Sequence, residues 1–149
     1  MKHQTRKQKF DDLANAINQI RKGVKVKRIG AKDGSIPTHP IVGVPDLPEQ
    51  EVLIECLRWL RVHNIFHNRH DCGAGDFGYG FATYGIKGAG DIIGLTKEGR
   101  YFELECKKGK GGRLSAGQQK RMKGIRDNGG LYFVCHGVGE LEFLMGEYV

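Results

Sequence analysis

The feature that most constrains the fold of this chain is a strict alternation of apolar and charged residues after Tyr101. Successive side chains of a β-strand point to opposite faces, so the pattern predicts a strand over residues 101–107. We expect its apolar face to be buried and its charged face to be open, which requires a sheet with a covering layer. The apolar positions are Phe102, Leu104 and Cys106, and the charged positions are Glu103, Glu105 and Lys107.

The patterns around this stretch predict further helices and strands. Apolar residues spaced three and four apart indicate helices, and short apolar runs bounded by glycines indicate strands. Taken together they predict an α/β (α+β) fold with a central mixed β-sheet flanked by helices. The predicted helices are 8–22, 48–63 and 115–128, and the predicted strands are 91–96, 101–107, 131–136 and 140–144, with an extended piece at 24–29 and a short apolar piece at 65–66.

Two glycine-rich stretches interrupt these patterns. Residues 23–45 contain several glycines and prolines and predict a linker. Residues 73–94 hold eight glycines and predict a mobile loop, because glycine adds little side-chain packing to a core.

Positive charge is concentrated near the N-terminus. The net charge is +7, but residues 1–32 carry ten Lys or Arg against two acidic residues, which leaves residues 33–149 close to neutral. A basic arm suits a polyanionic partner, because phosphate contacts release counterions, although a basic terminus can also be merely solvated. We therefore expect a basic helical arm with linker at 1–45 and a main domain at 46–149.

The composition also bears on where the protein works. No run of apolar residues approaches the length of a membrane span, and the basic residues 1–9 are not followed by the apolar stretch of a secretory signal. The four cysteines form no C-x-x-C pair, and the patterns around Cys56 and Cys106 predict buried thiols. We expect a reduced, cytoplasmic protein without membrane contact.

Asp91, Glu105 and Lys107 are the residues that predict chemistry. Asp91 opens an apolar strand, and Glu105 and Lys107 share one face of the next strand. If the two strands are hairpin neighbours, the two carboxylates can converge on a hard cation such as Mg²⁺. The lysine could then hold a phosphate or assist a metal-bound water. The alternative is an ordinary solvent-facing Glu/Lys pair.

The wider pattern resembles the VRR-NUC family, the virus-type replication-repair branch of the PD-(D/E)XK nucleases. It comprises an aspartate opening an apolar strand, an E-x-K strand, a basic glycine loop and a leucine-serine-x-x-glutamine helix start, within residues 48–136. The segments are Gly88-Ala89-Gly90-Asp91-Ile92-Ile93-Gly94, Tyr101-Phe102-Glu103-Leu104-Glu105-Cys106-Lys107 and Gly109-Lys110-Gly111-Gly112-Arg113-Leu114-Ser115-Ala116-Gly117-Gln118.

The resemblance implies a PD-(D/E)XK core with a metal site for Mg²⁺ or Mn²⁺. Its ligands would be Asp91, Glu105 and the backbone carbonyl of Cys106, and Lys107 would be the catalytic lysine. The family also uses a glutamate on the first core helix. Among the glutamates of that helix, Glu49 shares the apolar stripe and is our choice, whereas Glu51 and Glu55 point away from it. A first-turn glutamate favoured by the helix dipole is the alternative.

Gln118 is the last residue that the resemblance places in the active site. Ser115-x-x-Gln118 is also a capping box, in which both side chains satisfy backbone N–H groups, and the two roles are compatible. Basic residues nearby are candidate phosphate contacts. These DNA-binding candidates are Lys108, Lys110, Arg113, Lys120 and Arg121.

A run of histidines raises the separate question of zinc. Its spacing, H-x3-H-x2-H-x-C, matches no standard structural zinc site, so we expect loop residues near DNA instead. The residues are His63, His67, His70 and Cys72.

These observations favour a metal-dependent DNA endonuclease. Members of the family that consist of this domain alone are similar to Holliday junction resolvases, which act on branched DNA as dimers, so duplex or branched DNA and a second copy of the chain are the expected partners. Phage replication or DNA repair is the expected setting, in a bacterial or phage-infected cell. The alternatives are a non-catalytic DNA-binding or replication accessory protein that keeps the fold, and an RNase.

Overall fold

The computed structural model describes residues 5–23 and 32–149, which belong to two units, Met1–Lys32 and Asp33–Val149. The first unit contains α1 (Arg6–Arg21), in agreement with the helix predicted at 8–22. Its apolar residues Phe10, Leu13 and Ile17 are exposed. The extended piece predicted at 24–29 lies outside the described residues.

The second unit is built on a mixed four-stranded sheet. Its strands are β2 (Phe66–Arg69), β5 (Ile92–Leu95), β6 (Tyr101–Cys106) and β8 (Leu131–Cys135), in the order β2-β5-β6-β8. The first three strands are antiparallel neighbours, whereas β6 and β8 are parallel. The prediction of a central mixed sheet is therefore confirmed.

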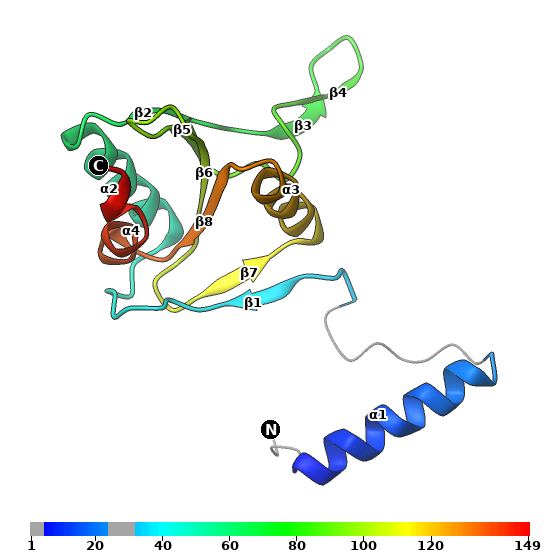
Figure 1. The fold of residues 1–149 in the computed structure, drawn as a ribbon. Coiled ribbons are helices and arrows are strands. Elements are labelled where there is room, and N and C mark those ends of the chain that lie inside the picture. The colour runs from blue at the N-terminus through cyan, green and yellow to red at the C-terminus, as the bar shows by residue number, and fades with distance from the viewer. Residues whose placement is uncertain (1–4, 24–31) are drawn as a thin grey trace. The chain divides into compact units, whose positions relative to one another are not determined.

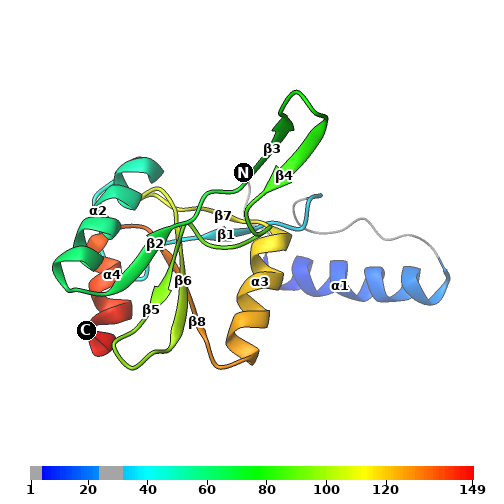
Figure 2. The same ribbon diagram turned by 90° about the horizontal axis from the view of Figure 1, so that it is seen from above.

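Helices cover both faces of this sheet. In Figures 1 and 2, α2 (Glu49–Val62) and α4 (Val138–Met145) lie on one side, and α3 (Ala116–Asp127) lies on the other. A 3₁₀ turn, η1 (Gly146–Tyr148), follows α4. The layer of α2 and α4 covers the apolar face of the sheet, where Ile92, Phe102 and Leu104 are completely buried. Among the described residues, no helix is long and apolar enough to cross a membrane.

The cysteines form no disulfide. Cys56 and Cys106 are buried, as their apolar surroundings predicted, and all four cysteines are free thiols. The Sγ atoms of Cys56 and Cys135 lie 3.8 Å apart, which is contact without a bond.

The second face of β6 differs from the prediction. Glu103, Glu105 and Lys107 are 0%, 3% and 8% exposed, so the charged face is buried as well. The reason is topological. Parallel strands cannot be joined by a tight turn, and the connection from β6 to β8 passes through α3, which covers this face. The expectation of an open charged face was therefore wrong.

The strand predicted at 140–144 is also wrong, because these residues belong to α4. Leu141 and Met145 are fully buried and four residues apart, the spacing of one helix face. The apolar positions of this short segment fit a strand and a helix equally well, and packing against α2 decides for the helix.

The glycine-rich segment contains regular structure where a loop was predicted. Strands β3 (Gly73–Asp76) and β4 (Phe81–Tyr84) form an antiparallel hairpin that projects from the sheet and its helices in both views (Figures 1 and 2). Gly78 and Gly80 adopt positive φ values of 85° and 116° in its tip, which explains glycine at these positions.

The segment that precedes α2 belongs to the second unit. Strand β1 (Ile36–Thr38) pairs with β7 (Gly112–Leu114), and a buried network joins His136 and Glu140 to this segment. His136 Nε2 lies 3.0 Å from Thr38 Oγ1, and Glu140 Oε1 accepts a hydrogen bond from the Ile41 amide. The arm predicted at 1–45 is therefore too long, because residues 33–45 are held by the main unit, 33–149.

Candidate active site

Two carboxylates meet where β5 and β6 are paired. Ile92 is opposite Leu104 in this antiparallel pair, and continuing the register by one residue places Asp91 opposite Glu105, on the same face of the sheet. Asp91 Oδ2 accepts a hydrogen bond of 2.8 Å from the Cys106 amide. The N–H and C=O of one strand residue point to the same edge, so the Cys106 carbonyl lies on the Asp91 side of β6.

Glu105 is held by two further side chains. Its Oε1 accepts hydrogen bonds of 2.5 Å from Lys107 Nζ and from Gln118 Nε2. Gln118 also closes the predicted capping box, because Ser115 N donates to Gln118 Oε1 and Gln118 N donates to Ser115 Oγ. The same glutamine thus caps α3 and contacts Glu105, since its two side-chain atoms serve separate partners.

A cleft of about 320 Å³ opens beside Asp91. Glu49, in the first turn of α2, lines it together with Asp91, and its charge contributes to raising the pKa of Glu105. The apolar stripe of α2, on which Glu49 was selected as the candidate glutamate, therefore faces the cleft at its first turn. Arg69 and Asp71 line the same cleft, from β2 and from the residues that follow it.

Burial raises the pKa of both carboxylates, and repulsion by Asp91 adds to the shift of Glu105. The pKa of Glu105 is raised to about 7, first by burial and then by the charge of Asp91, while Lys107 opposes the shift. The pKa of Asp91 is also raised, mainly by burial, against the hydrogen bond from Cys106 and the charge of Lys107. Two adjacent carboxylates that resist ionisation together form a site that a cation would stabilise.

The donor set fits a hard divalent cation. Asp91, Glu105 and the Cys106 carbonyl offer oxygen atoms, the ligands that Mg²⁺ and Mn²⁺ prefer. Tyr132 adds a second observation: it is 1% exposed, and its hydroxyl has no hydrogen-bond partner among the described residues. Its pKa is raised by burial and then by the charge of Glu105. Tyr132 is opposite Glu103 in the β6–β8 pair, and a buried water would satisfy its hydroxyl. Within residues 5–23 and 32–149, no three His, Cys, Asp or Glu side chains are grouped to bind a metal.

Glu103 forms a second acidic centre that the sequence did not reveal. Arg121 donates two hydrogen bonds to its Oε1, the Tyr101 hydroxyl donates a third, and the Gly90 amide donates to Oε2. Burial raises the pKa of Glu103, but these partners outweigh it and the pKa is lowered. The sequence did contain a signal for this centre, because Glu103 shares one face of β6 with Glu105 and Lys107. That signal can be interpreted only when both faces of β6 are known to be buried.

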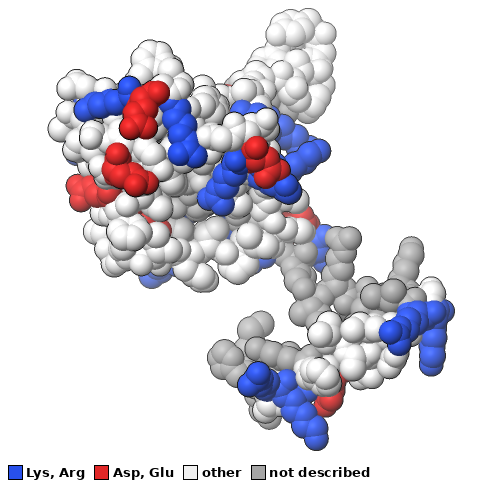
Figure 3. Space-filling view, in the orientation of Figure 1, with Lys and Arg blue, Asp and Glu red and all other residues white. Residues whose placement is uncertain are grey.

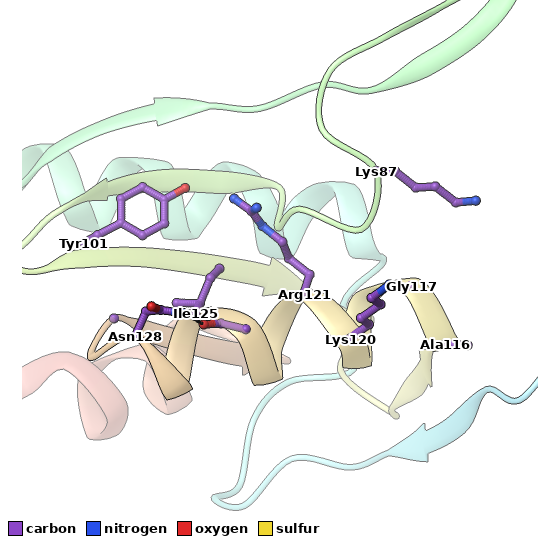
Figure 4. Close-up of a pocket in the computed structure, with 10 residues that line it drawn as sticks. Lys87, Tyr101, Ala116, Gly117, Lys120, Arg121, Ile125 and Asn128 are labelled. Carbon is purple, nitrogen blue, oxygen red and sulfur yellow. Dashed lines mark hydrogen bonds between the residues drawn. The ribbon is translucent and has the colours of Figure 1, made fainter.

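Arg121 was predicted to contact DNA, and its position limits that role. Its guanidinium lies 2.5 Å from Glu103 Oε1, in an ion pair with a completely buried carboxylate. Figure 4 shows its side chain directed towards the sheet, on the side of Tyr101. Arg121 therefore neutralises the charge of Glu103, and this pairing reduces the attraction that Arg121 could exert on a phosphate.

The other basic candidates lie at the surface. Lys108 and Lys120 are exposed, Lys110 pairs with Asp46 at 2.9 Å, and Arg113 donates hydrogen bonds to the side chain and backbone of Ser35. Lys120 lines a larger hollow of about 960 Å³ beside α3, together with Lys87 from the loop before β5 (Figure 4). Glu105 and Lys107 line neither hollow.

The histidine run forms no metal site in the structure. His63 Nδ1 contacts the Trp59 carbonyl, His67 Nδ1 contacts the Ile65 carbonyl, and His70 Nε2 accepts a hydrogen bond from the Ile86 amide. Each ring thus has a local structural partner. Cys72 is exposed.

No protein-family model, curated protein or solved structure matches the chain.

Proposed function

We propose that this protein is a metal-dependent DNA endonuclease with a PD-(D/E)XK active site. The observation that carries the proposal is the register of β5 and β6, which sets Asp91 opposite Glu105 with Lys107 bonded to Glu105. The resemblance of these residues to the VRR-NUC pattern supports the same conclusion. The basic arm and the exposed lysines that line the larger hollow beside α3 suit a polyanionic ligand.

In this proposal each residue has a separate task. Asp91, Glu105 and the Cys106 carbonyl bind the metal, and Glu49 faces the same cleft from α2. A Mg²⁺ or Mn²⁺ ion held there would activate water and neutralise charge on the scissile phosphate. Gln118 positions Glu105 through its amide, and Lys107, which is bonded to Glu105, would be placed to donate a hydrogen bond to a phosphate oxygen of the substrate.

The direct test is cleavage of supercoiled plasmid and of a synthetic four-way junction with Mg²⁺, Mn²⁺ or EDTA. Asp91→Asn and Glu105→Gln should abolish cleavage, because each removes a charged ligand with little change in volume. Glu142→Gln, at an exposed position of α4, is the matched control and should cut normally. A folded Glu105→Gln variant with full activity would overturn the proposal, as would absence of cleavage by the wild-type protein. RNA cut in preference to DNA would make the enzyme an RNase.

A further inference from the structure

The β3–β4 hairpin carries an unusual density of exposed aromatic rings. Large apolar side chains in contiguous exposed groups commonly mark interaction sites, whereas single ones need no explanation. The aromatic residues of this hairpin and their exposed fractions are Phe77 46%, Tyr79 84%, Phe81 76% and Tyr84 54%.

Two of the four rings have a structural role. Tyr84 lies over Gly73, where a Cβ atom would come within 2.5 Å of the tyrosine hydroxyl, and Phe77 lies near Gly75. The rings of Phe77 and Tyr84 also meet edge to face, with their centroids 6.2 Å apart. These contacts hold the hairpin together and account for Phe77 and Tyr84.

The other two rings are the most exposed of the four. Tyr79 stacks on Phe77 with the ring centroids 6.2 Å apart, yet its side chain remains 84% exposed. Phe81 stacks on no other ring within the described residues. Contacts within the hairpin therefore cover little of the rings of Tyr79 and Phe81.

The chain on either side of the hairpin lines two separate hollows. The chain enters it after Asp71, which lines the cleft with Asp91 and Glu49. It leaves through Gly85, which packs against the Asp71 backbone, and reaches Lys87, which lines the hollow beside α3. A ligand bound at both hollows would therefore lie near the residues that precede and follow the hairpin.

The charges around the hairpin favour a polyanion as that ligand. Lys and Arg side chains gather over α3 beside the hairpin, whereas its projecting end shows no charge on this face (Figure 3). Lys87 and Lys120 are exposed and line the hollow beside α3, whereas Arg69, in the cleft, is paired with Asp71 at 3.1 Å. A phosphate backbone bound by Lys87 and Lys120 would run beside the hairpin that carries the rings.

We propose that Tyr79 and Phe81 stack on unpaired bases of a DNA substrate held at the neighbouring cleft. This inference rests on the proposed nuclease function and deepens it by naming the two side chains that would select DNA with unpaired bases. Flat rings stack on any base, so the contact needs no sequence. Bases inside a continuous duplex are already stacked on their neighbours, so the rings favour junctions, flaps and single-stranded regions over plain duplex.

The test compares binding of two DNA probes by variants of the full chain. In a Glu105→Gln background, without cleavage, affinity is measured for a four-way junction with unpaired bases at its branch point and for a duplex of the same length, each with 2-aminopurine at the central position. Tyr79→Ala and Phe81→Ala should each weaken junction binding by about 5- to 150-fold, the range for loss of one base–aromatic stack. Affinity for the duplex should change little. Wild-type hairpin residues should quench the fluorescence of 2-aminopurine in the bound junction, and this quenching should be lost in the alanine variants.

Two controls keep the result specific. Phe143→Ala removes a ring of similar exposure, 68%, from α4 and should leave both affinities unchanged. Tyr79→Leu and Phe81→Leu keep an apolar side chain in the hairpin but lose the flat ring, and should behave like the alanine variants.

Each outcome decides the matter. Unchanged junction affinity, or equal losses of affinity for junction and duplex, would overturn the proposed role of the hairpin. The proposed nuclease function would still be supported if the wild-type protein cleaves DNA. A wild-type protein that neither binds nor cuts DNA would overturn both. If light scattering shows a wild-type dimer that Tyr79→Ala converts to a monomer, the hairpin is a contact between copies of the chain, and base stacking is refuted.

Discussion

Replacement of Glu105 by glutamine should stabilise the metal-free protein at alkaline pH. The pKa of this carboxyl rises from 4.5 to about 7 because it is buried and faces Asp91, even with Lys107 beside it. The folded protein therefore keeps the Glu105 proton at pH values where the unfolded chain has released it. Since the folded state binds more protons over this range, the free energy of unfolding falls as the pH rises from about 4.5 to about 7.

The size of the effect follows from the two pKa values. Each tenfold change in the protonation equilibrium is worth about 1.4 kcal/mol, so ionisation of Glu105 costs the folded state about 3 kcal/mol above pH 7. Glutamine resembles the protonated acid and can accept the same hydrogen bonds from Lys107 and Gln118. The variant should therefore gain up to about 3 kcal/mol at pH 8 and almost nothing at pH 4.

The assay is urea unfolding of wild-type protein and Glu105→Gln in EDTA at pH 4 and pH 8. Glu142→Gln, on the exposed side of α4, should follow the wild type at both pH values. Added Mg²⁺ should stabilise the wild type at pH 8 and leave Glu105→Gln unchanged, because bound metal stabilises only a folded state that holds its ligands. A variant less stable than wild type at pH 8, or a stability difference that is equal at the two pH values, would refute the reasoning.

Three further outcomes test the remaining roles. Lys107→Ala should reduce the single-turnover cleavage rate far more than DNA affinity, whereas Lys108→Ala should mainly weaken binding; equal effects would make Lys107 an ordinary phosphate contact. Deletion of residues 1–32 should lower the slope of log affinity against log salt by about 0.9 for each lost phosphate contact, with an unchanged rate on saturated DNA, and an unchanged slope in a folded truncation would exclude the arm from binding. Arg121→Ala should cost about 3 kcal/mol in urea unfolding, because it leaves Glu103 buried without its charge partner; a loss below about 0.5 kcal/mol would contradict the buried ion pair.

Local patterns were sufficient to predict the elements that carry the candidate site. The alternation at 101–107 and the apolar run after Asp91 correspond to β6 and β5, and Ser115 with Gln118 marks the start of α3. Each of these signals is short-range, because strand alternation and helix capping depend on neighbours in the sequence. The pairing of Asp91 with Glu105 followed once two consecutive strands were taken as hairpin partners.

The segments that were predicted wrongly have a different feature in common, because contacts between residues distant in the sequence determine their structure. Residues 140–144 fit a strand until α4 packs on α2, and residues 33–45 look like a linker until His136 and Glu140 bind Thr38 and Ile41. The hairpin at 73–84 depends on rings lying over glycines, a contact that composition does not encode. None of these contacts is visible within a window of neighbouring residues.

The burial of both faces of β6 explains how two glutamates of one strand come to differ. Glu103 and Glu105 are two residues apart on the same covered face, yet the pKa of Glu103 is lowered and that of Glu105 is raised to about 7. Glu103 receives Arg121, the Tyr101 hydroxyl and a backbone amide, so its charge is satisfied within the protein. Glu105 faces Asp91 and shares one oxygen between Lys107 and Gln118, so its charge lacks full compensation. Environments that move two carboxyl pKa values apart separate a structural acid from a reactive one, and here the uncompensated acid is the one beside the second carboxylate.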